Sequence, residues 1–206
     1  MGAVEKAPIL GPSEPKVGMR REVERIIRDV EFEFLNAKVR VQANCDYQAL
    51  DLPGLELGPF KEGERYSLPL WAALELERKG IVKLIEAPEL SVEELISIHS
   101  KETRIPKGLF ELPSDFYPRL RMLLARVGRE ALKDPSKVPE LRRVENMARD
   151  IVNARLKKLI SLASSVARSP LTRRCLTPEE EFVFDLVGDI ADTWREEVMG
   201  RGGANR

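Results

Sequence analysis

Side chains that carry out covalent chemistry or bind metals are scarce in this 206-residue chain. It contains one histidine, His99, and two cysteines, Cys45 and Cys175, which stand 130 positions apart. Neither cysteine has another cysteine or a histidine at ligand spacing, so we expect two buried, reduced thiols and no zinc site. His99 follows Leu95 and Ile96 on one helical stripe, which predicts a half-buried structural histidine. The sequence therefore predicts no catalytic residue and no metal site.

Signals for nucleotide binding and for membrane insertion are missing as well. The chain has no Gly-x-x-x-x-Gly-Lys-Ser/Thr loop and no Gly-x-Gly-x-x-Gly turn, which argues against nucleotide hydrolysis and against a dinucleotide cofactor. No apolar run approaches the ~20 residues of a membrane span, and no signal-peptide core opens the chain. We therefore expect a soluble, cytoplasmic protein without a cofactor.

A net charge is also absent, because 34 Lys and Arg balance 34 Asp and Glu. No overall field therefore draws the chain to nucleic acid or to a membrane. The charges are unevenly placed, however. Residues 119–174 hold 15 basic against five acidic residues, and residues 177–197 hold eight acidic residues against Arg195 alone. Either these two regions dock on each other or they face different partners.

The first half of the chain predicts a small β-rich domain over residues 23–88. Residues 1–22 lack an apolar period and predict a flexible arm, although a short helix fits the apolar spacing of residues 20–28. Apolar residues alternate over residues 30–34 and again over 39–41, which predicts a hairpin. Further strands are predicted over residues 64–68 and 81–85, with a helix over residues 70–76 packed on the sheet.

The second half predicts a helical domain over residues 89–199. Capping boxes at Ser91 and Thr177 begin two helices, and another helix begins near Ser114. The longest helix is predicted over residues 138–167, from apolar residues at three- and four-residue steps. Four helices with short links indicate a bundle, followed by a frayed tail over residues 200–206. The predicted fold class is α+β, mostly α: a small N-terminal β-rich domain followed by a four-helix, bundle-like all-α domain.

The apolar stripes of the two longest C-terminal helices are wider than one neighbouring helix can cover. Leu156 and Ile160 widen the stripe around Leu159, and Phe182 lies beside the line of Val183. Leaving such a side chain in water forfeits roughly 1.5–3 kcal/mol. Either the stripes form a thick core within one molecule, or they form a subunit interface, which we favour. The expected interface residues are Leu141, Ile151, Val152, Arg155, Leu156, Leu159, Ile160, Phe182, Val183, Leu186, Val187, Ile190 and Trp194.

A group of arginines lies within residues 119–143. It is explained either as a solvated helix face with ion pairs to Glu130, Glu140 and Glu145, or as a contact for DNA phosphates or for an acidic partner. Aromatic residues for base stacking are sparse there, so any DNA contact would be electrostatic, weak and non-specific. The group comprises Arg119, Arg121, Arg126, Arg129, Arg142 and Arg143.

Two motifs resemble those of a known family. The first is Gly58-Pro59-Phe60 followed by Leu68-Pro69-Leu70-Trp71, where glycine and proline fix turns and Pro69 is placed to open a helix. The second is Arg155-Leu156-Lys157-Lys158-Leu159 in the longest helix. In order and spacing, these motifs resemble the GINS replication-complex subunits, in particular the archaeal type with the small β domain first and the helical domain second. They define the fold and carry no chemistry.

Arg155 lies on the apolar side of its helix, where a charged group needs a partner. Either its stem packs while its head reaches solvent, or it forms a structural ion pair that holds helices or subunits together. The resemblance favours the ion pair.

The resemblance implies a non-catalytic structural subunit of the GINS complex in chromosomal DNA replication. It implies a heterotetramer, in which two copies of this chain join two copies of a related subunit with swapped domain order. It also implies that the complex bridges and stimulates the MCM replicative helicase with a RecJ-like partner on the chromosome. The alternative is a stand-alone nucleic-acid-binding regulator that uses the basic helix surface of residues 119–143.

Overall fold

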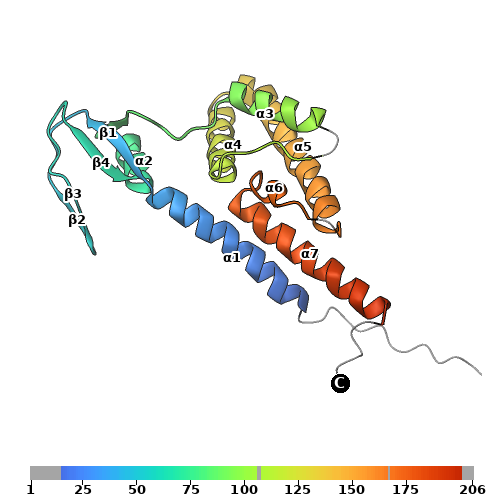
Figure 1. Ribbon diagram of the computed structural model, residues 1–206. Helices are drawn as coiled ribbons and strands as arrows, with labels where there is room; N and C mark the ends of the chain where they lie inside the picture. Colours follow the sequence, from blue (N-terminus) through green and yellow to red (C-terminus); the bar gives the residue numbers. More distant parts are fainter. Residues whose placement is uncertain (1–14, 106–107, 167, 201–206) are drawn as a thin grey trace, which may run out of the picture.

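The computed structural model describes residues 15–105, 108–166 and 168–200 of the chain. A small β-rich module lies at one side and a group of helices at the other, and the long helices α1 and α7 run side by side (Figure 1). The elements in chain order are α1 (Pro15–Asn36), β1 (Lys38–Ala43), β2 (Leu50–Leu52), β3 (Leu55–Leu57), β4 (Arg65–Pro69), α2 (Leu70–Arg78), β5 (Val82–Leu84), α3 (Val92–Arg104), α4 (Phe116–Lys133), the 3-10 turn η1 (Pro135–Lys137), α5 (Val138–Ala163), α6 (Pro170–Arg173) and α7 (Pro178–Val198).

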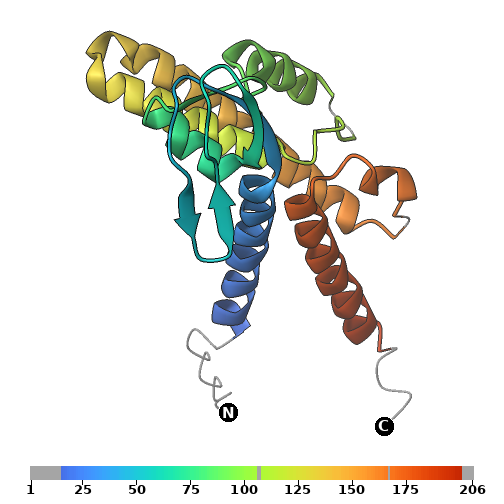
Figure 2. The same cartoon turned by 90° about the vertical axis from the view of Figure 1, so that its left-hand side faces the viewer.

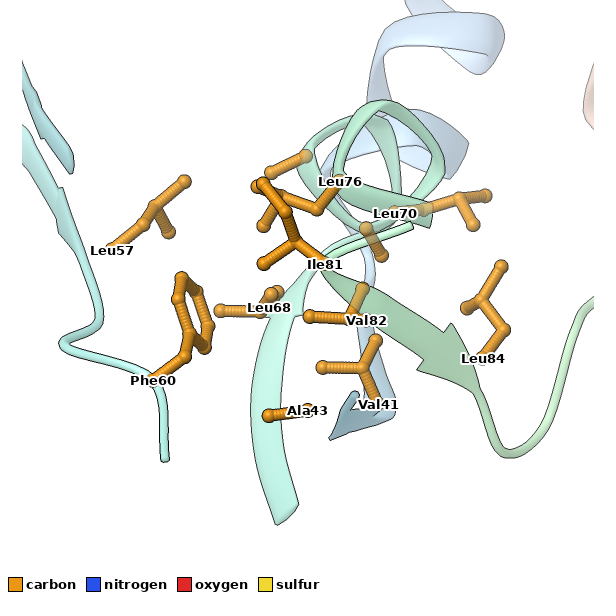
Figure 3. Packing of buried hydrophobic residues seen from close by; sticks show 12 residues of the cluster. Val41, Ala43, Leu57, Phe60, Leu68, Leu70, Leu76, Ile81, Val82 and Leu84 are labelled. Carbon is orange, nitrogen blue, oxygen red and sulfur yellow. The ribbon is translucent and has the colours of Figure 1, made fainter. Parts of the chain in front are cut away.

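The β-rich module is built on an antiparallel sheet in which β1 lies between β4 and β5. The strands predicted near residues 64–68 and 81–85 are therefore confirmed, and so is the helix packed on them, α2. Leu57 and Phe60 point from a separate segment toward Leu68 (Figure 3). The strands β2 and β3 form a second, isolated hairpin that was not predicted. The main buried residues of this core are Val41, Leu57, Phe60, Leu68, Leu70, Ala73, Leu76, Ile81, Val82 and Leu84.

The Gly-Pro-Phe motif places an aromatic ring in this core. Phe60 is 1% exposed and packs edge-to-face on Tyr66, with ring centroids 5.0 Å apart. Gly58 has a φ of 95°, a conformation that glycine adopts without the strain of a side chain. Pro69 ends β4 and is the N-cap of α2. It was predicted to be the first residue of the helix, a position that Leu70 takes instead. The turn, strand and helix start predicted for this stretch are confirmed.

The segment ahead of the sheet forms one continuous helix over residues 15–36, so the short helix that fitted residues 20–28 is confirmed but is much longer than expected. The hairpin expected over residues 30–41 is therefore wrong, and only its second half is a strand, β1. Residues 15–22 belong to α1 and not to a flexible arm. The other residues of that predicted arm, 1–14, lie outside the described residues, as do residues 201–206 of the predicted tail.

The side chains of α1 explain why a helix forms there. Arg20 and Glu24 pair at 2.8 Å across one helical turn. Val30 and Phe34, four residues apart, are half-buried on the side that meets the rest of the molecule, whereas Phe32 is 69% exposed. The two-residue alternation over residues 30–34 is thus a fragment of a helical pattern that begins further upstream.

The helical domain is organised around α5, which contacts α3, α4 and α7. The capping box predicted at Thr177 is present with both of its hydrogen bonds, and Ser91 caps α3 by accepting from the Glu94 N–H. Helix α5 ends at Ala163, four residues earlier than predicted, where the Arg168 guanidinium binds the Ala163 carbonyl at 2.8 Å. The fold class, α+β and mostly α, is confirmed.

We expect Gly58→Ala to destabilise the protein by about 1–3 kcal/mol. An alanine there would have to adopt the positive φ, and its Cβ would lie 3.1 Å from the Phe60 ring. Gly128→Ala in α4 is the matched control, because no atom lies within 4 Å of its Cβ; it should stabilise the helix by about 0.8–1 kcal/mol. Urea denaturation followed by circular dichroism measures both changes. Equal stability of the Gly58→Ala and wild-type proteins would contradict this account.

Candidate subunit interface

A buried arginine holds the helical domain together. Arg155 of α5 has a side chain with no exposed surface. Its Nε and one terminal nitrogen donate to the two carboxylate oxygens of Glu180 at 2.5 and 2.6 Å. The terminal nitrogens also donate to the Glu102 carboxylate at 3.0 Å and to the backbone carbonyls of Phe110 and Cys175 at 2.7 and 2.9 Å. These five hydrogen bonds match the five N–H donors of a guanidinium.

The two carboxylates are themselves satisfied by further donors. Glu102 accepts from Lys158 Nζ at 2.6 Å, and Glu180 accepts from the Tyr117 hydroxyl at 2.7 Å. Burial lowers the pKa of Arg155, but the hydrogen bonds and charge of Glu180 outweigh this and raise the pKa above its ordinary value. Burial and the Glu180 charge raise the pKa of Tyr117, so its hydroxyl stays a donor. The network joins α3, α4, α5 and α7.

The expectation of a structural ion pair at Arg155 is therefore correct, and the pair joins helices of one chain. Because the side chain has no exposed surface, the alternative of a guanidinium that reaches solvent is excluded. Ile151 and Leu159, on the same side of α5, are 0% and 3% exposed. These three residues were expected at a subunit interface. They belong to the core of the chain instead, because they have almost no surface to offer a partner.

The neighbouring side of α5 and the outer half of α7 remain uncovered. We call Val152, Leu156 and Ile160 the α5 ridge; they recur every four residues and are 41–46% exposed. We call Ile190, Trp194 and Val198 the α7 ridge; they have the same spacing and are 52%, 65% and 61% exposed. The remaining expected interface residues are half-buried: Leu141, Phe182, Val183, Leu186 and Val187.

Polar contacts hold the outer half of α7 against the end of α5. Arg168 donates to the Gly188 carbonyl at 3.0 Å and pairs with Asp192, which also binds Arg195 at 2.9 Å. Arg195 in turn donates to the Ser164 carbonyl just beyond α5. A Cβ at residue 188 would lie 2.9 Å from the Arg168 guanidinium, so glycine allows this close approach. The α7 ridge is thus presented on a positioned helix.

Helix α1 adds a second uncovered surface, which the sequence analysis missed. Among residues 18–36, whose side chains the structure describes, none is buried, although α1 runs beside α7 (Figures 1 and 2). Met19, Ile27 and Phe32 are exposed. The sequence predicted a helix only over residues 20–28; oppositely charged residues at three- and four-residue steps, such as Glu22 with Arg25, are the signal that could have extended it.

The predicted basic group divides into two sets. Arg119 pairs with Glu94 at 2.8 Å, Arg121 with Glu31, and Arg126 with Glu130 at 3.2 Å. In the part of the chain that the structure describes, the other three make no ion pair and are exposed: Arg129, Arg142 and Arg143. Half of the group therefore stabilises the fold, and only the other half remains available to a partner.

The scarce reactive side chains do not gather into a site. His99 is half-buried and lies 3.2 Å from Asp150. Both cysteines are free thiols, but they are of intermediate exposure and not buried as expected. Among the described residues, no group of three or more His, Cys, Asp or Glu side chains could hold a metal ion. None of the helices that the structure describes has the length and apolar character needed to cross a bilayer.

Comparison with known proteins links these surfaces to an assembly. The family model described as the GINS complex protein helical bundle domain matches residues 89–199, more than half of the chain. The chain belongs to the GINS family of DNA replication proteins. A second model, described as the PSF2 N-terminal domain, matches residues 27–85 of this GINS subunit. The resemblance deduced from the two motifs is therefore confirmed.

Three curated GINS proteins are similar to this chain. A Caenorhabditis elegans protein described as "Probable DNA replication complex GINS protein PSF2" is 31% identical over 62% of this chain and 66% of its own length. The DNA replication complex GINS protein PSF2 of Homo sapiens is 28% identical over 67% of this chain and 72% of its own length. The protein of the same description from Xenopus laevis is 26% identical over 68% of this chain and 72% of its own length.

We expect Arg155→Ala to lower the free energy of unfolding by about 3–5 kcal/mol, because it leaves Glu102 and Glu180 charged, buried and unpaired. Arg149→Ala is the control, since Arg149 lies on the same helix but is exposed; its effect should stay within about 0.5 kcal/mol. Chemical denaturation measures both. A loss as small as that of the control would show that the buried network contributes little.

Glu179, in the first turn of α7, generates a pH-dependent prediction. Its side chain is 10% exposed, its nearest cation is Arg121 at 3.9 Å, and neither carboxylate oxygen has a hydrogen-bond partner among the described residues. Burial raises the pKa of this carboxyl above 4.5. The folded state thus binds the proton of this carboxyl more tightly than the unfolded state does. Once the pH exceeds the ordinary pKa of a glutamate, the ionised side chain therefore destabilises the folded protein.

We therefore expect Glu179→Gln to be more stable than the wild type at about pH 7 and equally stable below about pH 4, where the carboxyl is protonated in both states. Urea denaturation of both proteins across this pH range measures the difference. Glu181→Gln, an exposed neighbour in the same turn, is the control and should show no such gain. A glutamine variant of residue 179 that is less stable at neutral pH would refute the assignment.

Proposed function

We propose that this chain is a non-catalytic structural subunit that assembles with a related GINS subunit of swapped domain order into a dimer of heterodimers. The observation that carries the proposal is the pair of apolar ridges left uncovered on α5 and α7. Six large apolar side chains are 41% exposed or more along these ridges. Complete burial of such a side chain contributes roughly 1.5–3 kcal/mol, so covering the exposed half of all six favours a permanent partner.

Helix α1 belongs to the same assembly surface. The helix runs beside α7 (Figure 2). Its exposed apolar residues Met19, Ile27 and Phe32 offer further area to a partner subunit. Of the residues expected at the interface, those that keep this role are Leu141, Val152, Leu156, Ile160, Phe182, Val183, Leu186, Val187, Ile190 and Trp194.

The assembled complex bridges the MCM replicative helicase and a RecJ-like protein on the chromosome and stimulates unwinding. The two-part architecture supports this role, because a β-rich module and a helical domain in one chain offer separate surfaces to separate partners. DNA contact is at most weak and non-specific, since only Arg129, Arg142 and Arg143 of the basic group lack ion pairs among the described residues. The same shortage disfavours a stand-alone nucleic-acid-binding regulator.

Co-expression with the related subunit tests the assembly. The wild-type pair should elute as a stable heteromer. Trp194→Asp should weaken the free energy of association by about 2 kcal/mol or more, as expected for the loss of a large aromatic at the centre of an interface. Leu132→Asp is the control, because Leu132 is 88% exposed at the end of α4 and lies on neither ridge. Light scattering after size exclusion gives the masses. A compact, soluble monomer that ignores the related subunit would contradict the proposal.

A further inference from the structure

Helix α1 lies against α4 and α7 of the helical domain, but it is fixed firmly at one end only. Phe34 and Leu35, in its last turn, pack against the core of the β-rich module. Just beyond the helix, the Ala37 carbonyl accepts from the Leu70 N–H at 2.9 Å. A segment with few buried contacts opens at a low cost in free energy. Residues 18–31 are such a segment, since the apolar side chains among them that are even half-buried are Val23, Ile26 and Val30.

A cleft of about 380 Å³ lies between α1 and the helical domain. Val30 and Phe34 line it from α1, Pro118 lines it from α4, and Pro178 lines it from the start of α7. A continuous protein core is close-packed and leaves no space of this size. The packing of α1 on the helical domain is therefore incomplete where the two meet.

One cation serves two carboxylates at this contact. Arg121 Nε of α4 donates to Glu31 of α1 at 2.6 Å, and a terminal nitrogen of the same guanidinium lies 3.9 Å from Glu179 of α7. The Glu179 side chain is 10% exposed, and neither of its carboxylate oxygens has a hydrogen-bond partner among the described residues. A buried carboxylate is costly until a donor reaches it. The two carboxylates therefore compete for Arg121.

The other charges nearby do not resolve this competition. Glu180, next to Glu179, is bound by Arg155 and offers no donor. The only cation that lines the cleft, Lys38, forms no ion pair with a residue that the structure describes. The carboxylates of the cleft lining are Glu33 and Asp115.

We propose that residues 18–31, which we call the strap, detach from the helical domain, and that Arg121 then changes its partner from Glu31 to Glu179. Glu179 already lies within 4 Å of the guanidinium, so the change requires only a small rotation. Glu31 returns to water, which solvates an ionised carboxylate well. Opening thus replaces one ion pair by another and leaves no cation unpaired. It uncovers the sides of α4 and α7 that face α1, and it needs no partner subunit, so the strap is independent of the proposed assembly.

Hydrogen–deuterium exchange of the full chain, read by mass spectrometry, tests whether the strap opens by itself. Peptides within residues 18–31 should exchange far faster than peptides of α5, which report the global unfolding. Strap peptides that exchange as slowly as those of α5 would overturn the proposal, because the strap would then open only when the whole protein unfolds.

A double-mutant cycle on the same peptides tests the change of partner. We expect Glu179→Gln to slow exchange of the strap by about threefold or more, because the open state loses its ion pair. In the Glu31→Gln background, Arg121 is free to bind Glu179 in both states, so Glu179→Gln should leave the exchange of the strap unchanged. Glu181→Gln, an exposed neighbour in the first turn of α7, is the control and should exchange like the wild type.

Two results of this cycle would contradict the proposal. If Glu179→Gln exchanges like the Glu181→Gln control, Glu179 has no influence on the strap. If Glu179→Gln slows exchange equally with and without Glu31, the two carboxylates act independently and do not share Arg121. Peptides of α5 that remain slow in every variant show that the fold is intact.

Discussion

Arg155 brings a full positive charge into the interior of the helical domain, where water cannot solvate it. Such a charge is tolerated only if every donor finds an acceptor, and the acceptors here come from α3, α7 and two loops. Each of these segments must therefore keep its place relative to α5. Glu180 illustrates the consequence, because the residue that binds the guanidinium also completes the capping box at the start of α7. One arginine thus fixes where α7 begins.

The direction of α7 follows from that anchor and decides which surface is free. Phe184 and Gly188 meet the rest of the domain, and Arg168 and Arg195 fasten the outer half to the end of α5. The side chains of the α7 ridge then point away from this contact and remain exposed. The chain therefore buries charged groups in its own core and leaves apolar ones on its surface. That distribution is costly for a monomer but suitable for a subunit whose partner covers the ridges.

Much of this arrangement could be predicted from local signals. Proline, glycine and capping residues marked the start of α2 and α7, and a charge on an apolar stripe required a partner for Arg155. Which carboxylates would pair could not be predicted, because Glu102 and Glu180 lie 53 and 25 positions away in sequence. Helix α1 was anticipated only over residues 20–28; its C-terminal part was misread because the alternation over residues 30–34 spans too few residues to distinguish a period of 2 from one of 3.6. How the β-rich module meets the helical domain, with Met122 of α4 packed against the core of the module, is encoded by no local pattern.

The same pairing rules limit what the basic residues can do. A cation already bonded to a carboxylate must break that bond before it binds a phosphate, so Arg119, Arg121 and Arg126 contribute less to nucleic-acid binding than their number suggests. They instead tie α4 to α1, α3 and the linker that carries Glu89. What remains for partners is mainly apolar surface with a few unpaired arginines at separate places. A surface of that kind recognises the shape of proteins far better than the uniform charge of DNA.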